Sequence, residues 1–408
     1  MGGLSAPWSP ADAQSRAGVV DSVLASALSW SAAETIPGIP TGSSIRSPFL
    51  ARHADSIYIA ANLFPVNALA GLWPRPAIVL RVPGNALPLP PGDFGFGFPK
   101  GVIDRYGTYH LFWSESTEPA SERRFRIPTA SSLWYSALVR GVWTAPQRLV
   151  KGSVLNWTTD QGTPIIDDAD RLHVVITASL DGTRNATLYL RRLGKRWDIQ
   201  QLSPAATYAT IVPWHHDTLV AAFIAPEKAN RSGGYLIYAA SSTDAGARWS
   251  QPRRVASSGA AVATAPALVV GGRTLHLLWA QNTHGGTGPD ALRYRYSKDA
   301  GRTWEAAEDG ALLHEGELAF VAAASACGAT AALIQSVAAV DEAPRSVVDE
   351  LRWTGVAARG AQLFPADVAL ASPALIEIDG TFHLIAAAVR QRGTPAVAIH
   401  ATRPSCPP

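Results

Sequence analysis

Cysteine and charge are both scarce in this chain of 408 residues. It has two cysteines, and charged residues make up only 16%, against about 25% in a typical soluble domain. Cys327 and Cys406 are too far apart to match the spacing of a metal site, so they form either one disulfide or two free thiols. Hydrophobic residues make up 47%, which excludes a mainly disordered chain.

Several functional signals are missing as well. The net charge is +3 and no Lys/Arg run is longer than a pair, which argues against a nucleic-acid-binding protein. No apolar run reaches about 18 residues, so no membrane span is expected. The N-terminus has no basic segment before an apolar one, which favours a cytoplasmic protein over a secreted one. Phosphate-binding and dinucleotide-binding glycine motifs are absent, and we expect neither a cofactor nor a metal ion.

Glycine and proline, by contrast, are abundant, with 34 and 30 residues. This composition disfavours long helices and favours short strands joined by turns. A pair of apolar strands joined by a polar turn recurs seven times, beginning at Ser47, Pro99, Thr163, Ala209, Ala265, Phe320 and Ser372. A second element, a strand and a glycine turn followed by Trp, recurs at Trp143, Trp197, Trp249 and Trp304, which are 54, 52 and 55 residues apart.

Each unit of about 52 residues therefore holds four short strands, which is typical of one blade of a β-propeller. We predict an all-β fold, a single propeller over residues 28–408 with four-stranded blades, seven by the repeat count and six as the alternative. The last unit supplies only three strands, and residues 28–37 are predicted to close it as the fourth. Residues 1–27 form an N-terminal extension, either a short helix or a frayed end.

Two of the tryptophan-containing turns share the pattern S-x-D-x-G-x-x-W. They consist of Ser242, Asp244, Gly246 and Trp249, and of Ser297, Asp299, Gly301 and Trp304. The pattern resembles the Asp-box (bacterial neuraminidase) repeat of sialidases and related propellers. Ser and Asp side chains can hydrogen-bond the turn backbone, and Gly can adopt a positive φ. The resemblance implies a structural role, because Asp boxes lie between outer strands.

The resemblance to sialidases also implies a type of active site. Arginines clamp the substrate carboxylate, a Tyr activated by a Glu is the nucleophile, and an Asp is the acid/base. The family's first Arg opens the first inner strand in an Arg-Ile-Pro motif. Arg46-Ser-Pro48 matches this motif in place, and Arg126-Ile-Pro128 matches it in sequence. The candidate catalytic residues are Arg46, Tyr208, Glu317 and Asp160, although here the Tyr precedes the Glu, in the reverse of the family's order.

The mouth of the propeller is the second place to search for function. Starts of inner strands and the loops between second and third strands share this mouth. The candidate ligand-binding residues there are Lys100, Gln161, Trp73, Arg126, Asn282 and His284, and the same loops also hold Asn62. Such a set suits a polar ligand such as a sugar.

Histidine recurs at one place in the repeat, as His110, His173, His276 and His383. Rotation around the ring separates these positions, so the pattern does not predict a shared metal ion. We expect each histidine to hydrogen-bond a neighbouring backbone group.

Three functions stay open, because a fold does not fix a function. The first is binding of a glycan or another small polar ligand at the central mouth, with or without hydrolysis. The second is an exo-sialidase-type glycoside hydrolase that uses Arg46, Tyr208 and Glu317. The third is a propeller enzyme of another class, a small-molecule cyclase or lyase. In each case the expected partner is a glycan or small molecule, and the chain is a monomer or an oligomer of unspecified size.

Overall fold

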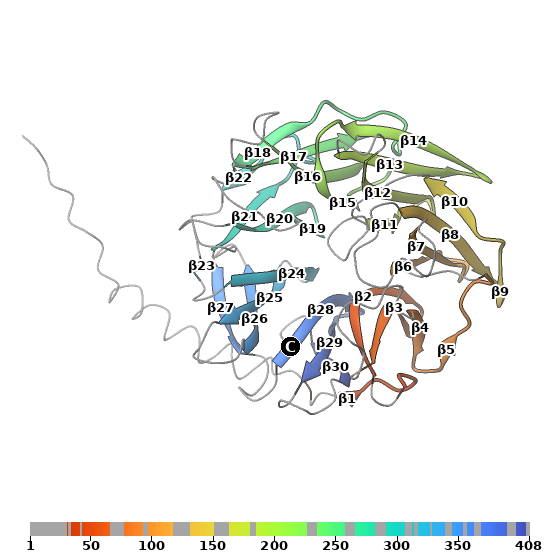
Figure 1. Ribbon diagram of the computed structural model, residues 1–408. Coiled ribbons are helices and arrows are strands. Elements are labelled where there is room, and N and C mark those ends of the chain that lie inside the picture. The colour runs from red at the N-terminus through yellow and green to blue at the C-terminus, as the bar shows by residue number, and fades with distance from the viewer. Residues whose placement is uncertain are drawn as a thin grey trace, which may run out of the picture.

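Short antiparallel strands in the computed structural model group into seven sheets around a common axis (Figure 1). The structure describes residues 31, 34–40, 43–65, 77–92, 97–116, 131–150, 163–179, 185–226, 235–257, 266–281, 291–306, 312–313, 317–326, 329–338, 345–353, 357–362, 369–389 and 397–404. Within these ranges no helix is long and apolar enough to cross a membrane. The predictions about residues 1–27, Cys327 and Cys406 fall outside them.

Blades one to three follow the chain in order. They comprise β2 (Ser43–His53), β3 (Ser56–Pro65), β4 (Ala77–Val82) and β5 (Ala86–Leu87); β6 (Gly97–Ile103), β7 (Tyr109–Ser116), β8 (Ser131–Val139), β9 (Val142–Trp143) and β10 (Gln147–Val150); and β11 (Thr163–Ile166), β12 (Leu172–Ser179), β13 (Asn185–Leu193) and β14 (Arg196–Ser203).

Blades four to seven complete the ring. They comprise β15 (Thr207–Pro213), β16 (Leu219–Pro226), β17 (Tyr235–Ser242) and β18 (Arg253–Ser257); β19 (Ala267–Gly271), β20 (Thr274–Gln281), β21 (Ala291–Ser297), β22 (Glu305–Ala306) and β23 (Leu312–Leu313); β24 (Glu317–Ala326), β25 (Ala329–Ala338), β26 (Arg345–Trp353) and β27 (Ala357–Gln362); and β28 (Ala369–Ile378), β29 (Thr381–Val389), β30 (Val397–Pro404) and β1 (Glu34–Thr35). The predicted propeller of four-stranded blades is confirmed, and its sheets correspond to the seven repeat units of the sequence.

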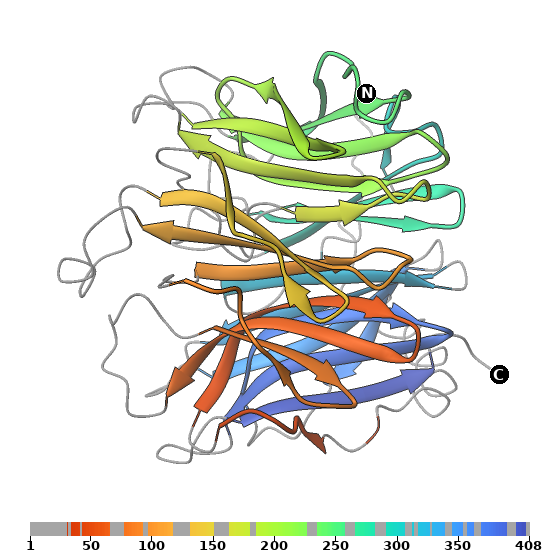
Figure 2. The same cartoon turned by 90° about the vertical axis from the view of Figure 1, so that its right-hand side faces the viewer.

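The hydrophobic core lies between neighbouring blades, whose sheets pack face to face (Figure 2). The second strand of each blade is therefore covered on both sides. In β16, the sequence LVAAFIAP is buried at every residue but the last. The outer strand β14 instead mixes exposed and buried residues. Continuous apolar runs in second strands thus follow from two-sided coverage.

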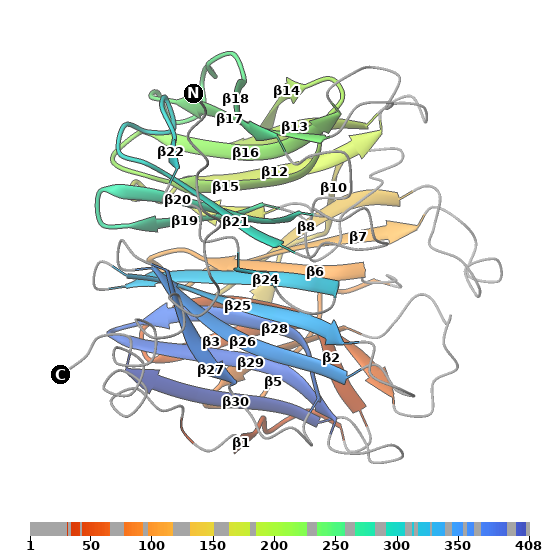
Figure 3. The same cartoon turned by 90° about the vertical axis from the view of Figure 1, so that its left-hand side faces the viewer.

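The ring is closed by a strand from the other end of the chain. In β1, Glu34 pairs with His400 and Thr35 with Ile399 of β30, and the two strands lie side by side (Figure 3). The Ile36 amide adds a hydrogen bond of 3.0 Å to the Ala398 carbonyl. This confirms the prediction that the N-terminal segment completes the last blade.

The two S-x-D-x-G-x-x-W turns have the same hydrogen bonding. The Gly246 amide donates to Ser242 Oγ at 2.8 Å and the Arg248 amide to Asp244 Oδ1 at 2.8 Å. In the second turn the Gly301 and Thr303 amides make the corresponding bonds, both at 2.9 Å. Gly246 and Gly301 have φ of 79° and 75°. These contacts support the structural role expected for both turns.

One of these turns also packs on the blade before it. Gly246 of blade four lies against Tyr189 of blade three, so close that an added Cβ would meet the tyrosine hydroxyl oxygen at 1.7 Å. Trp249, from the same turn, packs edge-on against the Tyr189 ring at a centroid distance of 4.9 Å. The turn therefore joins two blades as well as two strands.

We expect Gly246→Ala to destabilise the protein by about 3 kcal/mol. The positive φ costs roughly 1–2 kcal/mol for an L-residue, and overlap with Tyr189 adds about 1–3 kcal/mol. Gly194→Ala is the matched control, because Gly194 has φ of +62° and open space around its Cβ position; it should cost about 1 kcal/mol. Urea unfolding of both variants measures the difference, and equal losses would contradict the proposed packing of Gly246 on Tyr189.

Candidate functional site

The inner strands of the seven blades form a closed ring around the axis (Figure 1). Each contacts the next in the order β2, β6, β11, β15, β19, β24 and β28, and β28 contacts β2 again. Because all of them run in the same sense, their N-terminal ends lie at one mouth. The ends of the second strands lie there too, since these strands are antiparallel to the inner ones.

Strand pairing is irregular near this mouth. In five inner strands the register shifts between Arg46 and Phe49, Gly97 and Lys100, Thr207 and Thr210, Leu318 and Phe320, and Ala371 and Ala374. Two residues within these shifts, Phe98 and Tyr208, have positive φ values of 47° and 54°. Bulges of this kind redirect side chains and are common beside binding sites.

Lys100 is a charged residue at a repeat position that is otherwise uncharged. It pairs with Phe112, two residues after His110. The inner-strand residues at the corresponding place in four other blades are Phe49, Thr163, Ala267 and Ala374. Packing of the repeat alone therefore does not call for a lysine here.

Lys100 is almost completely buried. The residue is 2% exposed, and its ammonium nitrogen lies 6.0 Å from the centre of the Phe49 ring of blade one. That separation is at the outer limit of a cation–π contact. Burial of an ammonium group has a desolvation cost, so Lys100 is an unusual residue for this position next to the mouth.

Asn62 fixes the bulge that precedes Lys100. It lies in β3 of blade one and is 2% exposed. Its Oδ1 accepts a hydrogen bond of 2.9 Å from the Phe98 amide of blade two. At the preceding residue, Ser114 Oγ of β7 donates to the Gly97 carbonyl at 3.2 Å. The backbone that carries Lys100 is thus held from two directions.

The remaining predicted site residues are placed only in part. Tyr208 lies in β15, half-buried against the apolar cluster between blades four and five. Arg46 and Glu317 lie in β2 and β24, and their side chains are outside the described part of the structure. The others fall wholly outside it: Asp160, Gln161, Trp73, Arg126, Asn282 and His284. The catalytic set Arg46, Tyr208, Glu317 and Asp160 therefore stays a prediction.

The recurring histidines bond to side chains, and the expected bond to backbone was wrong. Nδ1 of His110 lies 2.8 Å from the Tyr135 hydroxyl, and Nδ1 of His173 lies 2.6 Å from that of Tyr189. His276 repeats the contact with a third tyrosine, Tyr294, at 2.7 Å. Each histidine belongs to a different blade, and the described residues hold no group of three or more His, Cys, Asp or Glu that could bind a metal ion.

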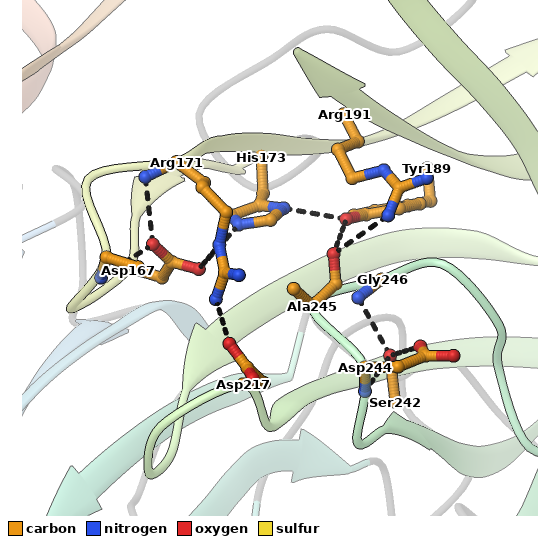
Figure 4. Close-up of polar contacts among 11 residues, drawn as sticks. Asp167, Arg171, His173, Tyr189, Arg191, Asp217, Ser242, Asp244, Ala245 and Gly246 are labelled. Atoms are coloured by element: carbon orange, nitrogen blue, oxygen red, sulfur yellow. Dashed lines mark hydrogen bonds and ion pairs between the residues drawn. The ribbon is translucent and has the colours of Figure 1, made fainter. Parts of the chain in front are cut away.

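Asp167 extends the His173–Tyr189 pair into a network between blades three and four (Figure 4). Its Oδ2 lies 3.1 Å from His173 Nε2 and accepts a hydrogen bond of 2.6 Å from Arg171 Nε. Burial acts to raise the pKa of Asp167, but the hydrogen bonds from His173 and Arg171 outweigh it and lower the pKa to about 2. Arg171 also bonds Asp217 of blade four at 2.5 Å. The network lies at the end of the strands opposite the mouth, and it serves to hold the blades together.

Comparison with known proteins identifies a fold and no family. No family model and no curated protein matches the chain, so the two Asp-box-like turns remain a resemblance. A polysaccharide lyase, PL25 ulvan lyase, has 11% identity and a TM-score of 0.58 over 91% of this chain and 96% of that chain. A second structure of this lyase is bound to -[GlcA(1-4)Rha3S]-.

Two further solved structures are similar to the chain. The polysaccharide lyase Uly1 has 10% identity and a TM-score of 0.50, over 91% of this chain and 90% of that chain. A Trypanosoma rangeli sialidase has 11% identity and a TM-score of 0.46, over 88% of this chain and 55% of that chain. At these identities the likeness shows the propeller fold alone.

The histidine of blade five should make stability depend on pH. Burial lowers the pKa of His276 to about 4, so the unfolded chain, with an ordinary pKa near 6.5, takes up the proton first. Stability is therefore lost as pH falls through 6.5 and levels off below about 4. Between pH 7 and pH 5 the contribution is about 2 kcal/mol.

Urea unfolding at pH 7 and pH 5 measures this effect. We expect the loss between the two pH values to be about 2 kcal/mol smaller in His276→Gln than in the unchanged protein. His216→Gln, at an exposed position, is the control and should keep the full loss. An unchanged pH dependence in His276→Gln would show that His276 is not held neutral by burial.

Proposed function

We propose that the chain binds an acidic carbohydrate at the mouth of the propeller, beside Lys100. The observation that carries the proposal is the lysine itself, a buried cation at a repeat position that holds Phe, Thr or Ala in four other blades. In a place with little water, an ammonium group attracts a carboxylate or sulfate more strongly than at the surface. An anionic ligand would therefore be attracted to the mouth beside Lys100.

The geometry around Lys100 supports a preorganised site. The Asn62 bond to Phe98 and the Ser114 bond to Gly97 hold the first part of the bulge from blade one and from β7 of blade two. A rigid backbone reduces the entropy lost on binding. The likeness to an ulvan lyase that binds a repeat of glucuronate and sulfated rhamnose supports a uronate-containing saccharide as the ligand class.

Catalysis by elimination is the second candidate function. In this reaction a base removes the proton beside the uronate carboxylate, a C=C bond forms, the glycosidic C–O bond breaks, and the leaving oxygen takes up a proton. Lys100 would neutralise the carboxylate, which makes the adjacent proton more acidic. The Tyr208 phenolate would take this proton from carbon and pass it to the leaving oxygen, so that the tyrosine returns to its starting state. The observation that favours Tyr208 is its positive φ at a bulge of the inner strand, the kind of strain found at functional sites.

Hydrolysis by a sialidase-type mechanism with Arg46, Tyr208 and Glu317 is the alternative reaction. It requires the three side chains to converge from β2, β15 and β24, on blades one, four and six. The polysaccharide lyases described above have TM-scores of 0.58 and 0.50. On this support we place elimination before hydrolysis.

Replacing the lysine tests the binding proposal. We expect Lys100→Met, which keeps the volume and removes the charge, to weaken binding of an oligosaccharide of glucuronate and sulfated rhamnose by about ten- to a hundredfold, as for loss of a charged hydrogen bond. Lys195→Met, at an exposed turn of blade three, should bind as the unchanged protein does. Isothermal titration calorimetry measures both, and equal affinity of the two variants would refute the proposal.

Product analysis tests the reaction. We expect the polysaccharide to yield unsaturated uronate ends, detected by their ultraviolet absorbance, and Tyr208→Phe to lower that rate by at least about a hundredfold. New reducing ends without unsaturation would assign hydrolysis instead. Release of free sialic acid from sialosides, lost in Arg46→Ala, would assign the sialidase alternative. No product from either substrate would leave binding as the function.

A further inference from the structure

Blade five differs from blades two and three beside its repeat histidine. In all three blades a tyrosine stands at the same place in the third strand, as Tyr135, Tyr189 and Tyr294, and contacts the histidine of that blade. The next residue on the same face is two positions further along each strand. It is Ala137 in blade two, Arg191 in blade three and Tyr296 in blade five.

The additional tyrosine extends a run of stacked rings. His276 and Tyr294 have a centroid distance of 5.9 Å and an interplanar angle of 25°. Tyr294 and Tyr296 follow at 6.2 Å and 28°. The run starts at His276, which is 8% exposed, and leads to the half-buried Tyr296 beside the exposed Lys298. The run therefore places the Tyr296 ring near the surface, with the rings of Tyr294 and His276 behind it.

Groups of opposite charge flank the outer ring. The Tyr296 hydroxyl donates a hydrogen bond of 2.5 Å to Glu305 Oε2, its cross-strand partner in β22. Lys298 Nζ lies 5.5 Å from the centre of the Tyr296 ring. An aromatic ring thus has a carboxylate at its hydroxyl and an ammonium group of an exposed side chain over its face.

This combination matches the chemistry of an acidic sugar. A pyranose has a face of C–H groups that packs on an aromatic ring, hydroxyls that donate to a carboxylate, and in acidic sugars a carboxylate or sulfate that pairs with a cation. We propose that Tyr296, Lys298 and Glu305 form a second carbohydrate site for a pyranose with a carboxylate or sulfate group. It lies at the end of the strands opposite the mouth, because Tyr296 pairs with His276 near the start of β20.

Such a site would hold a long polysaccharide at the outside of the propeller. It is separate from the Lys100 site, so either can exist without the other. A short saccharide at the mouth and a long polymer on the protein therefore report on different sites. The two proposals can be tested in the same set of variants.

The experiment is native affinity electrophoresis in gels that contain polyglucuronate, with dextran as the neutral polymer. We expect the full chain to be retarded by polyglucuronate, and Tyr296→Ala to raise the apparent Kd at least tenfold. Lys298→Met should raise it about threefold and reduce its dependence on salt, because one ion contact is lost. Tyr296→Phe, which keeps the ring and loses the bond to Glu305, should stay within about threefold of the unchanged protein.

Tyr106→Ala is the matched control. Tyr106 is 79% exposed and has the Arg105 guanidinium 5.6 Å from its ring centre, so it is also a surface tyrosine beside a cation. In the described contacts it has neither a stacked second ring nor a carboxylate bonded to its hydroxyl. Its removal should leave retardation unchanged. Thermal unfolding of each variant checks that the fold is intact.

The outcomes separate the two sites. Retardation lost in Tyr296→Ala and kept in Lys100→Met supports the second site. Retardation lost in Lys100→Met and kept in Tyr296→Ala overturns the second site and supports the mouth. An equal loss in Tyr106→Ala, or no retardation of the unchanged protein, also overturns it. Calorimetry with the short oligosaccharide tests the mouth independently of each of these results.

Discussion

The packing of one blade's turn on an aromatic ring of the blade before it holds this propeller in register. Trp249 and Gly246 of blade four cover Tyr189 of blade three. Trp197 of blade three packs edge-on against Tyr135 of blade two at 5.2 Å. The described sheets share no strand, so no backbone ladder joins the blades. Side-chain packing must therefore fix each blade relative to the next.

These contacts explain why the two ends of the strands differ. At one end, the aspartate–histidine–tyrosine contacts join strands of blade three, and the Arg171–Asp217 ion pair and the packing of Trp249 on Tyr189 join blade three to blade four. At the other end, five inner strands shift register, and Phe98 and Tyr208 have positive φ inside such bulges rather than in hairpin turns. The inner strands can bulge at the mouth because contacts at the opposite end of the strands fix the positions of the blades. Lys100 lies in this tolerant region, and blade packing does not dictate its identity.

Much of the architecture could be predicted from the sequence, because a propeller repeats one local pattern. Strand periodicity, glycine turns and the recurring tryptophan are local signals, and the missing fourth strand of the last unit pointed to β1. The partners of His110 and His173 could not be predicted, since Tyr135 and Tyr189 lie in the next strand of the hairpin and require its register. Lys100 could be predicted as a site residue because it lies at the start of an inner strand. Its contact with Phe49 could not be predicted, because that contact joins two blades. Convergence of Arg46, Tyr208 and Glu317 depends on distances across the ring, which repeat spacing does not encode.

The closure of the ring has a consequence for the order of folding during synthesis. Blade seven combines β1 with β28–β30, so residues 34 and 35 find their partners only near residue 400. The other sheets consist of consecutive strands and can form as the ribosome releases them. The β1 segment, made early, must wait through the synthesis of six blades before its strand partner exists. Closure is thus the contact of longest sequence separation, and loop-closure entropy makes such contacts slow to form.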